Sequence, residues 1–353
     1  MNYKRKIHII NAQPGQVLAE DVFQSEPEMS LIAPKNLRLS SHAIKRLLDF
    51  GVRYLHIYSE EKSPEIQGEG LIRLKEEFKS QYEGSANVVK EVLNDLVVGK
   101  KLEIETIEPV FSSMYEQVSQ NYSLIDCINE VRTADAYTYH HSLNVSLYAG
   151  LLGVWLDLPQ HTIQEIIQAG VLHDVGKAKI SQEVLSKKGP LTAQEFTEMK
   201  KHSIFGYQLV KNTKQINDDI CNGVLMHHEK ASGEGYPLKL TNEKIHPYAK
   251  IIAVADVYDA LTSERAYKKR FTPFDTFQEL QKIGYTHFDP KIIITFLNNI
   301  VNYYIGAKVL MNTGETGEIT AVLQQNITKP IVRIGDRLID LSRDTNYQIV
   351  QMI

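Results

Sequence analysis

Residues 163–177 have the sequence IQEIIQAGVLHDVGK, an apolar helical run that ends on an adjacent histidine and aspartate. Neighbouring helical residues point about 100° apart, so His173 and Asp174 can both ligate a metal only near a helix end, where a carboxylate can also bridge two ions. Lys177 follows one turn on, where an ammonium can meet a phosphate. The same residues are also typical of an ordinary helix C-terminus that stops at Gly176.

Helical spacing of apolar residues continues on both sides of this run, from Tyr122 to about Ile305, and is interrupted at turns that contain proline or glycine. The pattern predicts a mainly α protein in which residues 123–305 form an all-helical bundle. Residues 63–122 are also helical in period but strongly charged, which indicates either a helical connector or an arm for dimerisation.

The two ends of the chain differ from this helical middle. Residues 1–62 contain runs rich in β-branched and aromatic residues around a serine-capped helix, and they predict a small α/β module with a regulatory role. Residues 306–353 contain five short strand-like runs separated by turn residues such as Gly314, which predict a small antiparallel β-unit.

The composition of the 353 residues excludes several classes of protein. The chain is 43% hydrophobic and 23% charged with a net charge of −4, so it has no overall electrostatic reason to bind DNA or an anionic membrane. Its longest apolar run, residues 146–156, is shorter than the ~18 residues that span a bilayer, and its start lacks a signal-peptide core. Two distant cysteines, Cys127 and Cys221, argue against a disulfide framework or a cysteine-ligated zinc site. We expect a soluble cytoplasmic protein.

Histidines are concentrated in the helical middle, where seven of the twelve lie within one quarter of the chain. Adjacent His227 and His228 end another apolar helical run, and paired imidazoles at a helix end suit divalent transition metals. His141 and His202 lie in two further helices that can face the same interior, although either alone is typical of an ordinary structural histidine. His140 is predicted to be the exposed neighbour of His141.

A carboxylate lies in an apolar helix further along the chain. Asp256 is flanked by the apolar residues of IIAVADV, and a buried carboxylate without a cation is costly or becomes protonated. A metal explains this pattern better than a solvated helix face does. Asp259, one turn on, is predicted to contact a ligand rather than the metal. The SERAYKKR segment that follows supplies a basic cluster, including Arg265 and Lys268, for phosphate or guanine recognition.

Together these positions supply seven nitrogen and oxygen ligands, enough for two metal ions with a bridging carboxylate. Such a pair activates water and stabilises a pentacoordinate phosphorus centre, so the residues alone point to metal-dependent phosphohydrolysis. Lys177, Arg265 and Lys268 are predicted to hold the phosphates. The seven predicted ligands are His141, His173, Asp174, His202, His227, His228 and Asp256.

The order of these motifs resembles the HD-GYP family of bacterial cyclic di-GMP phosphodiesterases, a branch of the HD-domain phosphohydrolases. The matching motifs are HHS, HDVGK, KKHSIFG, HHEKASGEGYP and AVADVYDALTSERAYK, and the resemblance covers residues 123–305. It implies an HD-type helical bundle and metal ligation by the seven residues named above. It also implies catalysis by Asp174 and Lys177, phosphate contact by Lys177, and substrate contact by Tyr236, Arg265 and Lys268.

The resemblance further implies two divalent ions, Fe or Mn, and hydrolysis of cyclic di-GMP to linear pGpG, in some members on to GMP. Some relatives hold a third ion with a glutamate one turn before the first ligand histidine. Tyr137 stands at that position here, and because a neutral phenol is a poor ligand we expect a dinuclear site.

Two partners are predicted besides the dinucleotide: a second copy of the chain through residues 63–122, and a diguanylate cyclase on the GYP loop around Tyr236. Two alternative functions stay open. One is a catalytically idle receptor for cyclic di-GMP. The other is hydrolysis of another cyclic dinucleotide, such as cyclic GMP-AMP.

Overall fold

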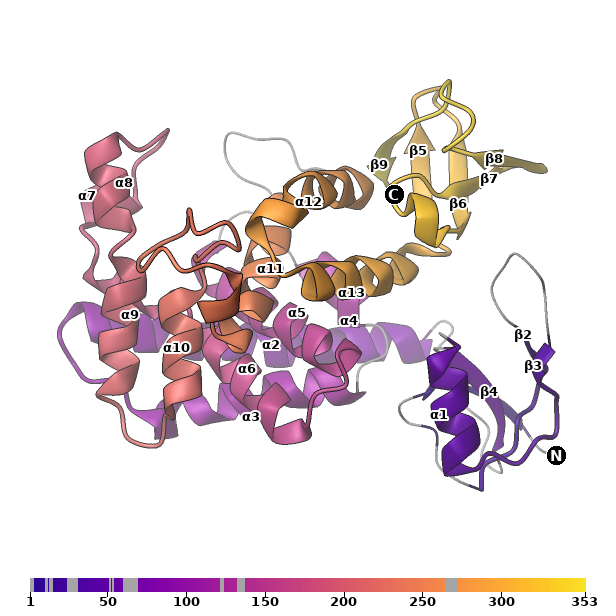
Figure 1. Cartoon of the computed structure of the whole chain (residues 1–353), viewed down its shortest axis with the longest axis horizontal. Coiled ribbons are helices and arrows are strands. Elements are labelled where there is room, and N and C mark those ends of the chain that lie inside the picture. Colours follow the sequence, from indigo (N-terminus) through magenta and orange to yellow (C-terminus); the bar gives the residue numbers. More distant parts are fainter. Residues whose placement is uncertain are drawn as a thin grey trace. The chain divides into compact units, whose positions relative to one another are not determined.

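The structure, a computed structural model, describes residues 3–9, 12, 15–23, 31–50, 52, 54–59, 69–120, 124–131, 137–263 and 272–353. The chain divides into two compact units, Met1–Glu77 and Phe78–Ile353. Helix α2 (Glu69–Val97) begins in the first unit and continues into the second (Figure 1). The boundaries expected near residues 62 and 122 lie outside the described residues.

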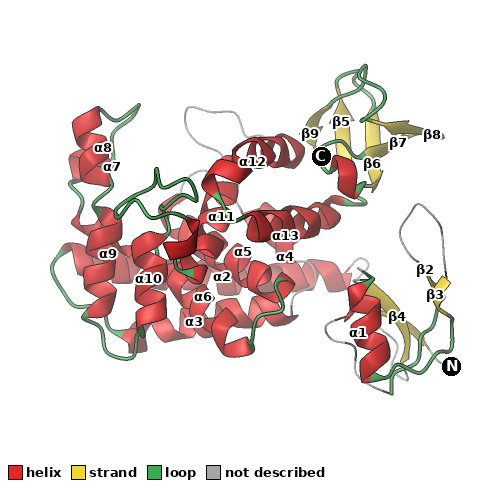
Figure 2. Cartoon of the chain, viewed as in Figure 1, coloured by secondary structure: helices red, strands yellow, loops and turns green. Residues whose placement is uncertain are grey.

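The first unit combines two small antiparallel sheets with helix α1 (Figure 2). Strand β1 (Tyr3–His8) pairs with β4 (Tyr54–Ser59), and β2 (Val22–Phe23) pairs with β3 (Leu31–Ala33). Helix α1 (Ser41–Asp49) begins after Ser40, whose side chain accepts a hydrogen bond from the backbone N–H of Ala43. The core of this unit consists of Ile7, Ile9, Leu18, Ala33, Leu39, Leu47, Leu55 and Ile57.

The second unit is mostly helical, which confirms the predicted mainly α fold. No helix among the described residues is both long and apolar enough to cross a membrane. The α-helices that follow α2 are α3 (Ile104–Gln120), α4 (Leu124–Val131), α5 (Tyr137–Trp155), α6 (Gln160–Leu172), α7 (Gln182–Leu185), α8 (Ala193–Met199), α9 (His202–Lys211), α10 (Asp218–Met226), α11 (Pro247–Thr262), α12 (Pro273–His287) and α13 (Pro290–Ile300). Short 3-10 helices lie between or after them: η3 (Val175–Lys179), η4 (Asn242–Lys244), η5 (Val301–Tyr304) and η6 (Gln324–Asn326).

Helix α5 lies at the centre of the bundle, because residues 140–152 are buried on every side of the helix. It packs against α6 and α11, and α10 packs against both of these helices. Glycines permit the close crossing of α5 and α6. A Cβ atom on Gly150 would lie 2.9 Å from the Ile167 side chain, and one on Gly170 would lie 2.7 Å from Cα of Ser146. The crossing holds the C-terminal end of α6 beside the first half of α5.

The C-terminal part of the chain forms a five-stranded antiparallel sheet with the strand order β8-β7-β6-β5-β9. The five strand-like runs of the sequence all form strands, which confirms the predicted β-unit. Their bounds are β5 (Lys308–Met311), β6 (Thr316–Ala321), β7 (Ile331–Ile334), β8 (Arg337–Asp340) and β9 (Ile349–Met352).

Candidate metal centre

The bundle brings all seven predicted ligands together from five helices. His141 lies in α5 and Asp256 in α11, whereas the other five lie at the ends of α6, α9 and α10. They form two groups in which the ligand atoms lie within 4.8 Å of one another. One group contains Asp174, His202, His227 and His228, and the other contains His141, His173 and Asp256.

A glycine sets the distance between two of these helix ends. Helix α6 ends at Leu172, and η3 starts directly after Asp174 and packs against α9. A Cβ atom on Gly176 would lie 1.9 Å from the carbonyl oxygen of His202 and 2.3 Å from the backbone nitrogen of Gly206. Only glycine therefore lets η3 approach α9 closely enough to place Asp174 beside His202.

Three of the histidines are oriented by their own helices. In His173, His202 and His227, Nδ1 lies 2.7 Å from the carbonyl oxygen three residues earlier, in Gly170, Met199 and Val224. Because a carbonyl oxygen only accepts, Nδ1 donates, and in a neutral ring Nε2 then carries the lone pair. Burial lowers the pKa of His202 and His227, which favours the neutral ring. Each ring thus turns a lone pair towards the centre, as metal-binding histidines do.

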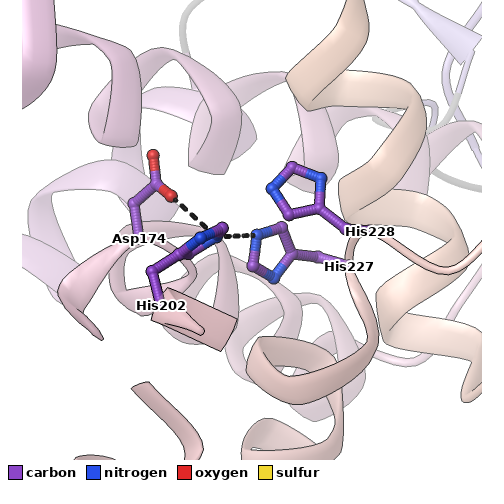
Figure 3. Close-up of side chains that lie close together, drawn as sticks. All are labelled: Asp174, His202, His227 and His228. Carbon is purple, nitrogen blue, oxygen red and sulfur yellow. Dashed lines mark hydrogen bonds and ion pairs between the residues drawn. The ribbon is translucent and has the colours of Figure 1, made fainter. Parts of the chain in front are cut away.

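The inward-facing atoms meet other acceptors instead of donors. Nε2 of His202 lies 3.2 Å from Nε2 of His227 and 3.4 Å from Oδ1 of Asp174 (Figure 3). Nε2 of His173 is buried and makes no hydrogen bond within the part of the chain that the structure describes. Lone pairs this close repel unless a cation lies between them. Imidazoles and carboxylates are ligands that first-row divalent metals accept, so the residues fit a metal.

The carboxylate of Asp174 faces both groups. Its Oδ1 faces His202, whereas its Oδ2 lies 3.3 Å from Nε2 of His173 and 3.7 Å from Nε2 of His141. Nζ of Lys177 donates to the same Oδ2 at 2.5 Å. Burial alone would raise the pKa of Asp174, but the positive charge of Lys177 and the neighbouring histidines lower it well below its usual value. The carboxylate therefore stays ionised and presents one oxygen to each group.

Asp259 orients His141 from behind. Its Oδ2 accepts from Nδ1 of His141 at 2.7 Å, so Nε2 faces Asp256, whose Oδ1 lies 3.1 Å away. Burial alone would lower the pKa of His141, but hydrogen bonds to Asp256 and Asp259 raise it to about 9. Asp259 is fully buried and belongs to neither ligand group. It contacts a predicted ligand, in the kind of position that the sequence suggests.

The GYP loop is held beside the centre by Glu229, a residue that was not among those predicted from the sequence. The buried carboxylate of Glu229 accepts backbone N–H bonds from Leu238, Lys239 and Leu240 at 2.6, 3.1 and 2.9 Å. A Cβ atom on Gly235 would lie 2.4 Å from Cα of Glu229. The hydrogen bonds to Glu229 and the absence of a Cβ atom at Gly235 together let the loop fold back tightly.

Tyr236 of this loop lies at the edge of the centre, where its ring centroid is 4.7 Å from that of His228. Two residues of α8 and its C-terminal end lie beside it. The Phe196 ring, 48% exposed, stands edge-on to Tyr236 at 6.5 Å, and Nζ of Lys200 lies 4.8 Å from the centroid of Phe196 and 5.9 Å from that of Tyr236. Neither Phe196 nor Lys200 is among the site residues predicted from the sequence. Their i, i+4 spacing just before His202 is the signal that could have indicated them.

Some predictions fail or fall outside the described residues. His140 is not exposed but buried, because α2 covers its face of α5: the Tyr82 ring lies 5.3 Å from it and a Glu83 oxygen 3.5 Å from its Nε2. Arg265 and Lys268 lie outside the described residues, as does the side chain of Tyr137.

A family model for the HD domain matches residues 110–292 of this chain. A cyclic di-GMP phosphodiesterase of Pseudomonas aeruginosa is 29% identical over 246 residues, which are 70% of this chain and 59% of that protein. The cyclic di-GMP phosphodiesterase response regulator RpfG of Xanthomonas campestris is 39% identical over 156 residues, 43% of this chain and 41% of that protein. A 3'3'-cGAMP-specific phosphodiesterase of Vibrio cholerae is 34% identical over 172 residues, 48% of this chain and 33% of that protein. The chain thus spans 33% to 59% of the length of these relatives.

Among solved structures, an HDG"Y"P protein from Bdellovibrio bacteriovorus matches with a TM-score of 0.52 at 17% identity. The match covers 85% of this chain and 99% of that chain. At this identity the likeness is evidence for the fold alone.

Proposed function

The chain belongs to the HD domain family, in its HD-GYP branch, and we propose on that premise that it hydrolyses cyclic di-GMP to linear pGpG, with GMP as the product of a second cleavage. One observation carries the proposal: the two oxygens of Asp174 face two separate groups of imidazole and carboxylate ligands. That is the arrangement a two-metal phosphodiesterase requires. Relatives named as cyclic di-GMP phosphodiesterases support the choice of substrate.

We propose two divalent ions, Fe or Mn, shared through Asp174. When bound, such ions supply an activated water and stabilise the negative charge that develops at phosphorus. One ion would be held by Asp174, His202, His227 and His228, and the other by Asp174, His141, His173 and Asp256.

The remaining residues have separate roles in the proposal. Lys177 keeps Asp174 ionised, and because an ammonium has three protons it can also donate to a substrate phosphate. The ring of Tyr236 offers a flat surface for a guanine base, with Lys200 beside it. Arg265 and Lys268 follow α11 in the sequence, and we propose that they hold the second phosphate.

A second candidate is hydrolysis of cyclic GMP-AMP, which the Vibrio cholerae relative favours by its identity of 34%. An idle receptor remains the alternative outside catalysis. Three further claims stay predictions. They are a second copy of the chain bound through residues 63–122, a diguanylate cyclase bound to the loop of Tyr236, and a cytoplasmic location.

The test uses the full chain, purified anaerobically, reconstituted with Fe²⁺ or Mn²⁺ and given either dinucleotide, with products separated by chromatography. Asp174→Asn should lose essentially all hydrolysis. The matched control is Asp157→Asn, an exposed position at φ 57 that asparagine tolerates. Binding of cyclic di-GMP without cleavage by the wild type would identify a receptor, and cleavage of cyclic GMP-AMP alone would identify the second candidate.

A further inference from the structure

A line of buried hydrogen bonds joins helix α2 to a predicted metal ligand. The Tyr82 hydroxyl donates to Oδ1 of Asn144 at 2.7 Å, and Nδ2 of Asn144 donates to Oδ1 of Asp259 at 2.9 Å. The other oxygen of Asp259 accepts from Nδ1 of His141 at 2.7 Å. None of the four side chains is more than 5% exposed. The bonds are therefore made away from water.

The chemistry of the four groups fixes the direction of each bond. The carboxylate of Asp259 accepts, so Asn144 must turn its NH₂ towards it and its carbonyl oxygen towards Tyr82. The Tyr82 hydroxyl supplies the proton that this orientation needs, and it lies closer to Oδ1 of Asn144, at 2.7 Å, than to its other acceptor, the carbonyl oxygen of His140, at 3.1 Å. His141 must likewise carry a proton on Nδ1, and its Nε2 faces Asp256 and Asp174.

Loss of the Tyr82 hydroxyl would leave the buried carbonyl oxygen of Asn144 without this donor. A buried acceptor without its donor is costly, so the Asn144 amide is held less firmly in the orientation that donates to Asp259. Asp259 in turn orients His141 less firmly. A second hydrogen bond joins the far end of α2 to η3, the 3-10 helix that also contains Lys177. Nζ of Lys179 in η3 donates to the carbonyl oxygen of Leu96.

We propose that Tyr82 is a positioning residue of the metal centre. Through Asn144 and Asp259 it holds His141 in the tautomer and orientation that ligate an ion. The inference rests on the metal centre of the proposed function, but it does not depend on the identity of the substrate.

The test is the Mn²⁺ affinity of metal-free protein, with free Mn²⁺ followed by electron paramagnetic resonance. Partners behind a ligand typically contribute 10–100-fold to metal affinity, and Tyr82 acts through two of them, so Tyr82→Phe should weaken binding by about tenfold. Tyr304→Phe is the matched control, because it also removes a buried hydroxyl bond, 2.8 Å to the hydroxyl of Tyr258, and should bind Mn²⁺ as the wild type does.

A double-mutant cycle separates positioning from a general loss of stability. Once Asn144→Ala has removed the link, adding Tyr82→Phe should not weaken Mn²⁺ binding further. Wild-type affinity in Tyr82→Phe, or additive losses in the double variant, would overturn the inference. Hydrolysis is measured separately: a wild type that binds Mn²⁺ but cleaves no cyclic dinucleotide would refute the proposed function, and the Mn²⁺ comparison would still decide the role of Tyr82.

Discussion

Replacing Gly176 with alanine places a methyl group where the backbone of α9 already lies. The added Cβ would be 1.9 Å from the carbonyl oxygen of His202, whereas ordinary contacts begin near 3.4 Å. The two segments must therefore separate by about 1.5 Å, since backbone atoms cannot rotate aside as a side chain can. That movement separates Asp174 from His202, whose Nε2 now lies 3.4 Å from the carboxylate.

Gly176→Ala should lower both the stability of the chain and its rate of hydrolysis. Overpacking typically costs about 1–3 kcal/mol, and a clash between backbones belongs at the upper end, so we expect a loss of about 3 kcal/mol in the free energy of unfolding. For a large domain this lowers the melting temperature by about 6–12 °C. A misplacement of about 1 Å in a catalytic group typically costs about a hundredfold in rate, so hydrolysis should fall at least that far.

The assay compares Gly176→Ala with Gly84→Ala, which lies in helix α2 with nothing within 4 Å of an added Cβ. The second change should stabilise the chain by about 0.5–1 kcal/mol, because alanine loses less conformational freedom than glycine in a helix. Thermal melts and Mn²⁺ affinity are measured for both variants. If Gly176→Ala melts and binds Mn²⁺ like the wild type, close packing of η3 on α9 does not set the geometry of the centre.

Arg265→Ala should weaken binding of cyclic di-GMP by about 1–3 kcal/mol and leave metal content unchanged, because arginine supplies charge-assisted hydrogen bonds but does not ligate a cation; calorimetry that shows lost metal with retained affinity would contradict this. Burial lowers the pKa of His202 and His227, and it lowers that of His228 to about 3. As the pH falls from about 6.5 to 5, the unfolded chain therefore binds protons that the folded chain does not, and the metal-free chain should unfold more easily. His141, with its pKa raised to about 9, acts in the opposite sense, since its stabilisation is complete below about pH 6.5 and is lost as the pH rises through 9. Urea unfolding should therefore show greatest stability near pH 6.5, and greater stability at pH 5 would refute the argument.

The fold could be predicted from the sequence wherever burial leaves an apolar run or a regular spacing of apolar residues. Residues 146–155 of the apolar run at 146–156 lie in α5, which is buried on every side along residues 140–152. The five C-terminal runs all form strands. One of the runs rich in β-branched and aromatic residues within residues 1–62 spans residues 17–23, and it is only partly a strand. Val22 and Phe23 pair with β3 as strand β2, whereas Val17 and Leu18 make isolated bridges. The side chain of Leu18 can be buried in the core without extended strand pairing.

The candidate site could be predicted because each predicted ligand lies at the end of an apolar helix or inside one, and because the motif order resembles a known family. The contacts behind the ligands could not be predicted in the same way. Tyr82 and Asn144 are 62 residues apart in sequence, and Asn144 and Asp259 are 115 apart. No periodic pattern links such pairs. The predicted exposure of His140 is wrong for the same reason, since α2 is distant in sequence from the face of α5 that it covers.

The measurement that tests the central claim most directly is the number of metal ions bound per chain, by elemental analysis of anaerobically prepared wild type and Asp174→Asn. Because the two oxygens of Asp174 face two ligand groups, we predict two ions per chain in the wild type and fewer than two in the variant. Three results would contradict a dinuclear centre shared through this carboxylate. They are one ion in the wild type, a third ion held by protein side chains, and two ions retained in Asp174→Asn.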